Sequence, residues 1–266
     1  MTSQTSRPGA ARSGESLGTV ARAIEIIRTV ADSPRPLSLT ELSTTLGLPT
    51  STVHRLTRLL EPQGMVRYDA ETRLYHPGEE LLRLGFLLSS RWSVEELARP
   101  TLQRVVAACD ETCQLSRYLP EQRSMMFVEQ VRCSHPLAFT LPLFQPQPLL
   151  WGSSGRVIMA HLPPAEVEAV LAAAEASPVA GFAPPSAEKL NEDLDRIRER
   201  GWDRTDGEKL AHAVGFAAPV FDAHGIHGSV ATPVPTARYS AEDHDRFVEL
   251  IVNAGRELSR LLGHQG

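Results

Sequence analysis

The stretch from Leu37 to Glu61 constrains the fold of this chain most, because two short helical patterns flank a Gly-Leu-Pro break. The first pattern is a stripe of leucines at helical spacing: Leu39, Leu42 and Leu46. Ser38 precedes it and Glu41 follows three residues later, the capping-box arrangement that satisfies free amides at a helix start. Gly47 tolerates the left-handed conformation that ends a helix, and Pro49 suits the first turn of a new one.

The second helix is predicted to bury one apolar face and to leave a polar and cationic face outside. The buried residues are expected to be Val53, Leu56, Leu59 and Leu60. The outer face carries Ser51, Thr52, His54, Arg55 and Arg58. A helix, a tight turn and a second helix of this kind have helix-turn-helix geometry. The alternative is an ordinary helical hairpin whose polar face is only solvated.

One more helix precedes this stretch and a hairpin follows it. Residues 20–31 repeat apolar side chains at helical spacing, while Met65–Tyr68 and Leu74–His76 are strand-like runs about a polar turn. Three helices and a two-stranded wing make a winged helix. Arg67 and Arg73 lie on the wing, where an arginine can meet a phosphate or the minor groove. The wing's alternative role is to cap the small core.

The charge distribution agrees with a nucleic-acid partner for the first part of the chain. The whole chain has a formal net charge of −5. Residues 1–78 hold 9 basic and 7 acidic residues, a net charge of +2, whereas residues 79–266 hold 18 and 25, a net charge of −7. All nine cations of the first part are arginine, which forks onto phosphates or guanine. The excess is small, but it lies with the helix-turn-helix.

Length and composition exclude several classes of protein. At 266 residues two domains are expected, and 42% hydrophobic with 22% charged residues is typical of soluble globular proteins. No apolar run approaches the roughly 18 residues of a membrane span and no signal peptide opens the chain, so we expect a cytoplasmic protein without a membrane partner. Cys109, Cys113 and Cys133 are too few for a disulfide framework. Cys109 and Cys113 could share a helix face, but no second pair completes a tetrahedral site, so no metal or other cofactor is expected.

From residue 79 onward, helical and strand patterns predict an α+β domain with an antiparallel sheet. Glu79–Ser90 is predicted to be a linker helix joined to dimerisation, because its apolar residues occupy more than one face. Further helices are predicted over residues 94–110, with Pro100 interrupting it, and over 157–162, 166–176, 190–200 and 241–262. Strands are predicted over residues 114–119, 125–131, 137–143, 216–221 and 226–233, with a proline-rich loop at 145–148 and a turn at 222–225.

The order of these motifs resembles the IclR family of bacterial transcriptional regulators, from about Val20 to the C-terminus. Leu46–Leu56 is similar to that family's turn and recognition helix almost throughout. The other matching segments are Ala217–Asp222 with Gly225, Gly155-Arg156, and Gly201-Trp202 followed by Glu208. Several motifs in the right order are more specific than any one of them.

The resemblance implies a winged helix-turn-helix and a GAF-like effector-binding domain that takes a small molecule. It also implies winged helices paired across a dimer, with two dimers often sharing one operator. The expected division is a disordered tail over residues 1–16, the DNA-binding domain over 17–78, the linker helix over 79–92 and the effector-binding domain over 93–266.

Two segments depart from the family's pattern at positions that line its ligand cavity. The family often has His-Ala-Thr-Ala where this chain has Leu150, Trp151, Gly152 and Ser153, and it often has a cysteine where this chain has Gly215. The identity of the effector therefore does not carry over. Trp151 offers an aromatic wall for a flat ligand, or else packs in the core.

The candidate DNA-binding residues lie on the second helix and the wing. The hydroxyls and amides of Thr50, Ser51 and Thr52 can meet phosphate oxygens, and one of the three residues can cap the helix. His54 and Arg55 can reach base edges, and Arg58 can meet the backbone. Arg67 and Arg73 of the wing complete the set.

The candidate effector-binding residues come from three segments. They are Ser153, Ser154 and Gly155 at a helix start, where amides favour an anion; Asp206 and Glu208 as acceptors; and Gly215, Ser229 and Thr232 on the closing strands. For each polar one, satisfaction by nearby backbone is the alternative. His224 and His227 are expected at the surface of a turn and not as ligands.

No motif indicates an enzyme. Gly152–Gly155 lacks the serine spacing of a nucleophile elbow, and no phosphate-binding loop, zinc-protease motif or paired-cysteine set is present. The predicted function is a ligand-responsive regulator that binds operator DNA as a dimer or a dimer of dimers and responds to a small organic acid, aromatic acids included. The alternative is a non-catalytic small-molecule-binding module whose helix-turn-helix serves protein contacts.

Overall fold

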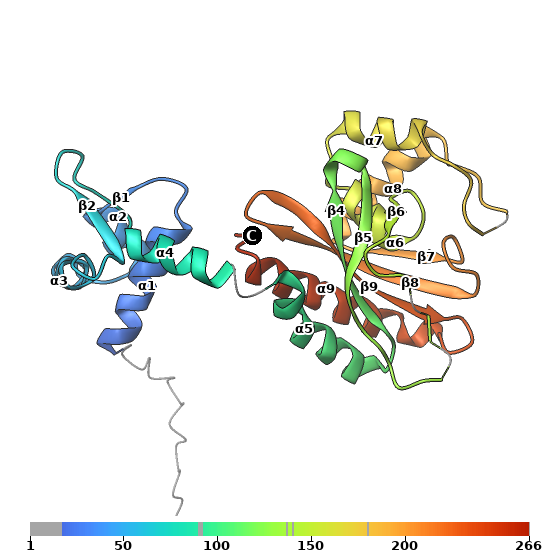
Figure 1. The fold of residues 1–266 in the computed structure, drawn as a ribbon, viewed down its shortest axis with the longest axis horizontal. Coiled ribbons are helices and arrows are strands. Elements are labelled where there is room, and N and C mark those ends of the chain that lie inside the picture. Colours follow the sequence, from blue (N-terminus) through green and yellow to red (C-terminus); the bar gives the residue numbers. More distant parts are fainter. Residues whose placement is uncertain (1–17, 90–92, 137, 140, 180, 266) are drawn as a thin grey trace, which may run out of the picture. The chain divides into compact units, whose positions relative to one another are not determined.

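The computed structural model describes residues 18–89, 93–136, 138–139, 141–179 and 181–265. The chain divides into two compact units, residues 1–91 and 92–266 (Figure 1). Within the described ranges, every helix is too short or too polar to cross a membrane. The expected disordered tail over residues 1–16 lies outside the described residues.

The first unit contains the predicted three helices followed by a hairpin. Its elements are α1 (Thr19–Asp32), β1 (Leu37–Ser38), α2 (Leu39–Leu46), α3 (Thr50–Leu60), β2 (Val66–Asp69), β3 (Leu74–Pro77) and α4 (Glu79–Ser89). The hairpin gains a strand that the sequence did not predict, because the two residues of β1 pair antiparallel with β3. The winged-helix prediction is confirmed.

A small apolar core holds this unit together. Ile26 of α1, Leu42 of α2, Val53 and Leu56 of α3 and Tyr75 of β3 are all buried in it. Burying such side chains stabilises the fold by about 1.5–3 kcal/mol each. These contacts fix α3 against α1, α2 and the wing.

The predicted burial of Leu59 in the α3 core is wrong. The Leu59 side chain is 58% exposed, while Thr57 is buried in its place. Burial at Val53, Leu56 and Thr57 follows the i, i+3, i+4 spacing of a single helix face, and Leu59 falls outside that face. The Thr57 hydroxyl tolerates burial because it donates to the carbonyl of His54 at 3.0 Å.

The second unit is an α+β domain built on one antiparallel sheet. Its elements are α5 (Val94–Cys109), β4 (Cys113–Leu119), η1 (Pro120–Gln122), β5 (Ser124–Val131), β6 (Pro146–Pro148), α6 (Ser153–Met159), α7 (Pro164–Ala172), α8 (Ala187–Arg200), β7 (Asp203–Asp206), β8 (Ala213–Asp222), β9 (Gly225–Pro235), η2 (Ala241–Asp243) and α9 (His244–Leu261). The strand order is β6-β5-β4-β9-β8-β7. The predicted fold class is confirmed.

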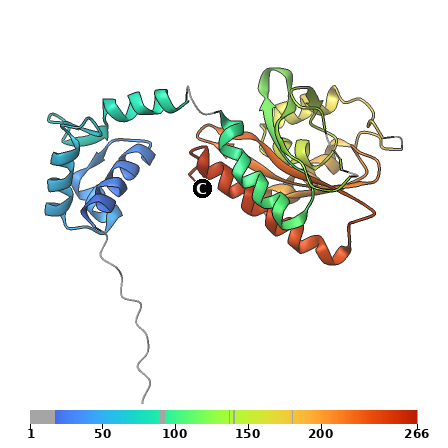
Figure 2. The same ribbon diagram turned by 60° about the horizontal axis from the view of Figure 1, so that its bottom comes forward.

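Helices cover both faces of this sheet (Figures 1 and 2). On one face, α5 and α9 pack with Phe216 and Ala218 of β8. On the other face, α6, α7 and α8 pack with Ala217 of β8 and with Phe127 of β5. Neighbouring β8 residues join opposite cores because side chains alternate along a strand.

The two edge strands differ from the prediction. Residues 137–143 form no strand in their described part: Leu137 and Thr140 lie outside the described residues, and Leu143 makes one isolated bridge to Phe127. The edge strand is instead Pro146–Pro148, in the segment predicted as a loop. Prolines fit a sheet edge, where no further strand needs their missing amide donors. The short polar strand β7 at the opposite edge was not predicted either.

Three smaller expectations also fail. Pro100 lies inside α5 without interrupting it. The C-terminal helical segment divides into η2 and α9. Cys109 ends α5 while Cys113 begins β4, so the two cysteines share no helix face.

Candidate DNA-binding and effector-binding sites

The turn between α2 and α3 is built by the residues that predict it. Ser38 Oγ accepts from the amide of Glu41 at 3.3 Å, and Glu41 Oε2 accepts from the amide of Ser38 at 2.8 Å. Arg35 also donates to Glu41 at 2.7 Å, and these hydrogen bonds lower the pKa of Glu41 to about 2. Gly47 ends α2 with φ of 61°. The capping box and left-handed cap are confirmed.

The outer face of α3 is polar and cationic. Ser51, His54, Arg55 and Arg58 are exposed, and Thr52 is half-buried. None of the predicted hydroxyls caps α3, because Pro49 occupies the N-cap position without a side-chain bond. The hydroxyl of Thr50 instead lies 3.2 Å from Ser43 Oγ and ties α3 to α2.

The wing presents its two arginines to solvent. Arg67 is exposed on β2, and Arg73 is exposed in the turn before β3 with φ of 58°. Asp69 Oδ1 orders this turn by accepting from the amides of Glu71 and Thr72 at 2.9 and 3.3 Å. The first unit therefore carries five exposed cationic or imidazole side chains at these positions: His54, Arg55, Arg58, Arg67 and Arg73.

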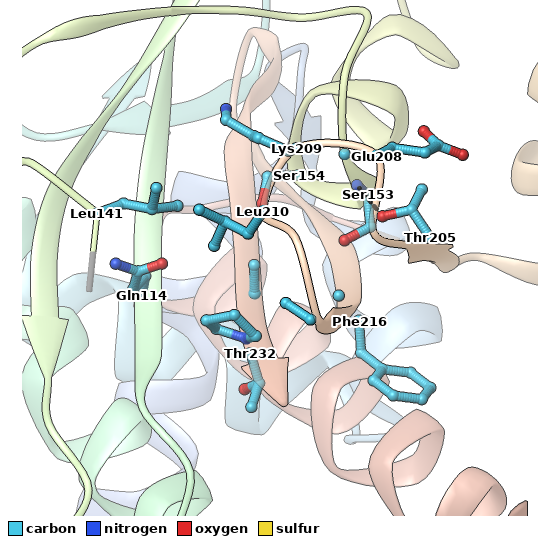
Figure 3. Close-up of a pocket in the computed structure, with 15 residues that line it drawn as sticks. Gln114, Leu141, Ser153, Ser154, Thr205, Glu208, Lys209, Leu210, Phe216 and Thr232 are labelled. Atoms are coloured by element: carbon cyan, nitrogen blue, oxygen red, sulfur yellow. Dashed lines mark hydrogen bonds between the residues drawn. The ribbon is translucent and has the colours of Figure 1, made fainter. Parts of the chain in front are cut away.

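In the second unit, a cavity of about 40 Å³ lies where the start of α6 meets the sheet (Figure 3). Five predicted effector residues line it: Ser153, Ser154, Glu208, Gly215 and Thr232. Gln114 of β4 and Thr205 of β7 add further polar atoms. A Cβ at residue 215 would lie 2.9 Å from Ser153 Oγ, so glycine there leaves room for the serine.

The other three predicted effector residues lie outside this lining, each for a physical reason. Gly155 packs on backbone, since a Cβ there would lie 2.0 Å from the carbonyl oxygen of Leu149. Asp206 is exposed and pairs with Arg204 at 3.1 Å. Ser229 is buried with its hydroxyl 2.6 Å from that of Ser116.

The expected anion site at the start of α6 is partly used by the protein itself. The amide of Ser153 donates to the hydroxyl of Thr205 at 3.1 Å. The helix that follows is also only seven residues long, from Ser153 to Met159, so its dipole is small. These amides alone do not make an anion site.

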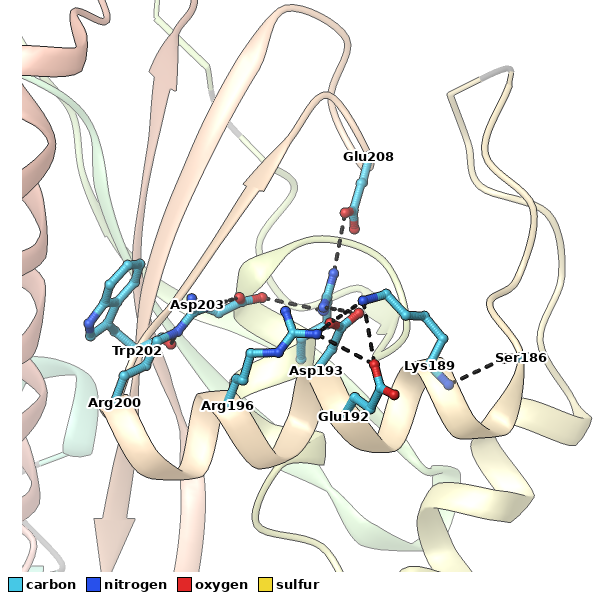
Figure 4. Close-up of polar contacts among 10 residues, drawn as sticks. Ser186, Lys189, Glu192, Asp193, Arg196, Arg200, Trp202, Asp203 and Glu208 are labelled. Carbon is cyan, nitrogen blue, oxygen red and sulfur yellow. Dashed lines mark hydrogen bonds and ion pairs between the residues drawn. The ribbon is translucent and has the colours of Figure 1, made fainter.

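An ion-pair cluster lies beside the cavity, and Figure 4 shows three of its acidic residues: Asp193, Asp203 and Glu208. Arg156 contacts all three. Its guanidinium is 3.3 Å from each of three carboxylates: Asp193 of α8, Asp203 of β7 and Glu208 of the following loop. Burial raises the pKa of Asp203 to about 6, although Arg156 and Arg200 both oppose this rise. Arg156 thus joins α6, α8 and β7 and holds the Glu208 carboxylate.

Lys209 lines the same cavity and was missed by the sequence analysis. Burial without an acidic partner lowers the pKa of its ammonium group to about 8. The available signal was compositional: the chain has only two lysines, Lys189 and Lys209, among its 27 basic residues. Lys189 is accounted for by ion pairs on the surface of α8.

Lys209 also lines a larger cavity, of about 580 Å³. Trp151 lines this cavity and is also buried in the core, which confirms the expected core packing. Its role as an aromatic wall for a ligand stays a prediction. The indole Nε1 of Trp151 donates to the carbonyl of Glu175 at 3.1 Å, which fixes the ring. Leu149 and Val170 extend the apolar wall, while Arg123 and Glu175 are exposed at this cavity.

Comparisons with known proteins agree with both units. The family described as "Bacterial transcriptional regulator IclR C-terminal" matches residues 87–260, and the "IclR helix-turn-helix domain" matches residues 19–70. The HTH-type transcriptional regulator BhcR of Paracoccus denitrificans is 28% identical, over 90% of this chain and 85% of its own length. The transcriptional repressor IclR of Escherichia coli is 24% identical, over 92% and 90%.

Solved structures show the same fold. HmgR of Pseudomonas aeruginosa has a TM-score of 0.72 at 26% identity, covering 92% of this chain and 97% of that one. An IclR homolog from Microbacterium hydrocarbonoxydans, complexed with 4-hydroxybenzoate, has a TM-score of 0.58 at 20% identity, with coverage of 92% and 99%. With its helix-turn-helix and its C-terminal effector domain, the chain belongs to the IclR family of bacterial transcriptional regulators.

Proposed function

We propose that this regulator binds operator DNA through the outer face of α3, as a dimer or a dimer of dimers, and that a small organic acid modulates the binding. The observation that supports this proposal most strongly is the division of α3 into a buried face and an exposed face. Val53, Leu56 and Thr57 are buried against the first unit, while His54, Arg55 and Arg58 are exposed. Such a helix can enter the major groove without disturbing its own core.

Each residue of this outer face and of the wing has a role that fits its chemistry. Arg55 and His54 read base edges, since an arginine forked onto guanine is the commonest specific contact. Ser51, Thr52 and Arg58 contact phosphates, and the hydroxyl of Thr50 also holds α2 against α3. Arg67 and Arg73 place the wing against the neighbouring backbone or minor groove.

Self-association is supported by apolar side chains that the first unit leaves in solvent. Val20 of α1 is 73% exposed, and Leu82 and Phe86 of α4 are 62% and 67% exposed. A groove of about 380 Å³ runs between Ala31 and Pro77 on one side and these α4 residues on the other. Exposed apolar groups of this size mark interaction surfaces, and a second copy of the chain is the partner we propose.

An organic acid as effector is supported by the chemistry of the second unit. Two of its cavities combine hydroxyls, a lysine whose ammonium nitrogen is buried, and an apolar wall around Trp151. The related Microbacterium protein carries 4-hydroxybenzoate. We propose that the ligand favours one of two states of the protein that differ in operator affinity, since a ligand shifts an equilibrium only through its differential affinity.

The proposed operator binding is tested by a gel shift with the DNA upstream of the protein's own coding sequence. The full chain should shift this DNA, most strongly at low salt. Arg55→Ala should weaken the shift, whereas Arg28→Ala removes an exposed charge from α1 and should have little effect. Absence of a shift at low salt would favour the alternative, a ligand-binding module whose helix-turn-helix serves protein contacts.

A further inference from the structure

Lys209 lines both the cavity of about 40 Å³ and the cavity of about 580 Å³. Its aliphatic stem packs against Gly152, where an added Cβ would lie 3.0 Å from Lys209 Cβ and 3.1 Å from Cδ. Gly152 has a φ of 82°, which also favours glycine. The residue before α6 thus leaves the space that the lysine stem fills.

The ammonium group has no partner among the residues that the structure describes. Lys209 Nζ makes no hydrogen bond or ion pair there, and it lies 5.6 Å from the centroid of the Phe127 ring. The neighbouring Glu208 contacts Arg156 instead, and Figure 3 shows the side chains of Glu208 and Lys209 leaving the loop in opposite directions. Buried charges in proteins are normally paired, so this ammonium group is suited to bind an anion.

The larger cavity has the size and the walls for a ligand that supplies this anion. Its volume of about 580 Å³ lies within the roughly 300–1,000 Å³ range of small-molecule pockets, which the cavity of about 40 Å³ does not reach. Trp151, Leu149 and Val170 offer an apolar surface. Of the charged residues lining it, Arg123 and Glu175 are exposed, whereas Lys209 is half-buried and its Nζ atom is buried.

We propose that Lys209 is the counter-ion for the carboxylate of a small monocarboxylic acid whose apolar body fills the larger cavity against Trp151. This inference rests on the proposed role as an effector-responsive regulator and names the ligand's chemistry. A charge-assisted hydrogen bond in a site of low dielectric is stronger than one in water. The lysine stem contacts Gly152, the residue before α6. A bound acid is therefore connected to the start of α6 through the Lys209 side chain.

The test compares acids with their own amides on the full-length chain. The probes are benzoate, 4-hydroxybenzoate, phenylacetate and hexanoate, each beside its neutral amide, followed by thermal melting and titration calorimetry. At least one acid should raise the melting temperature while its amide does not. Lys209→Gln should weaken binding of that acid about 30-fold or more, the loss typical of breaking a buried charge pair.

The chain offers a matched control, since Lys189 is its other lysine and lies on the surface of α8. Lys189→Gln should bind the acid like the wild type. Lys209→Met, which suits a buried site, replaces Lys209→Gln if the latter melts early without ligand. Three results would overturn the assignment: equal binding by either Lys209 variant, equal binding of acids and amides, or no stabilisation by any of the acids. If the wild type still shifts its operator in those cases, the proposed DNA-binding function is retained and only the assignment of Lys209 fails.

Discussion

Replacing Arg156 by methionine removes a cation that three carboxylates share. The guanidinium is 3.3 Å from Asp193, Asp203 and Glu208, and the Asp203 side chain is only 2% exposed. Leaving a buried charge without its partner costs about 3–5 kcal/mol. Arg200 still donates to Asp203, so we expect the lower end, about 3 kcal/mol. For a domain of this size, about 2–4 °C per kcal/mol gives a fall of about 6–12 °C in the melting temperature.

The stability lost in Arg156→Met should also depend on pH, and the loss should be greater at the higher pH. The pKa of Asp203 is raised to about 6 from the ordinary 3.8, so the folded protein binds this proton more tightly than the unfolded chain. This contribution to stability therefore increases as the pH falls from about 6 to about 4. Loss of Arg156 raises the pKa of Asp203 further. The variant should therefore lose more unfolding free energy at pH 7.5, where Asp203 of the wild type is ionised, than at pH 5.

Thermal melting of the full-length chain at these two pH values is the assay, with Arg196→Met as the control. Arg196 also contacts Asp193, at 3.1 Å, but it is 55% exposed, and exposed ion pairs contribute about 0–1 kcal/mol. A loss below about 1 kcal/mol for Arg156→Met, or an equal loss at both pH values, would refute the reasoning about this cluster.

The helix cap of α2, the close packing at Gly155 and the ammonium group of Lys209 each give a further prediction. Ser38→Ala removes half of the capping box, which costs about 1 kcal/mol, so hydrogen exchange of the α2 amides should become about fivefold faster; an unchanged rate would contradict the role of the cap. Gly155→Ala places a Cβ 2.0 Å from the carbonyl oxygen of Leu149 and should cost at least about 3 kcal/mol in chemical unfolding, whereas a tolerated alanine would disprove the close packing. Affinity for the carboxylic acid should be constant between about pH 6 and pH 7, where the carboxylate is ionised, and should fall about tenfold per pH unit well above 8, as Lys209 loses its proton. The other charged residues lining the two cavities are an arginine and two glutamates, so a flat calorimetric profile from about pH 6 to about pH 9.5 would exclude the lysine as counter-ion.

Local features were predictable because their interactions lie close together in the sequence. The capping box needs only Ser38 and Glu41, and the left-handed end of α2 needs only Gly47. The β8–β9 hairpin is likewise set by its short turn, with Asp222 paired to Gly225. Such features depend on neighbours within a few residues, and the sequence displays them directly.

Features that depend on distant partners were not predictable. The proline-rich strand β6 forms because β5 offers it an edge, and nothing in residues 146–148 alone indicates a strand. The sequence predicts the Ser229 hydroxyl to line the effector cavity, yet this hydroxyl is hydrogen-bonded to that of Ser116, 113 residues away. Lys209 is unpaired only because the fold directs Glu208 to Arg156, and no local pattern encodes that choice.

The most direct test of the account is the operator dissociation constant at one fixed salt concentration. It is measured for the wild type with and without the stabilising acid, and for Arg55→Ala. We expect the acid to change the wild-type constant at least about fivefold, and Arg55→Ala to weaken binding by about 1–3 kcal/mol without changing stabilisation by the acid. An Arg55→Ala protein that binds the operator as tightly as the wild type, or an acid that leaves the constant unchanged, would contradict the account.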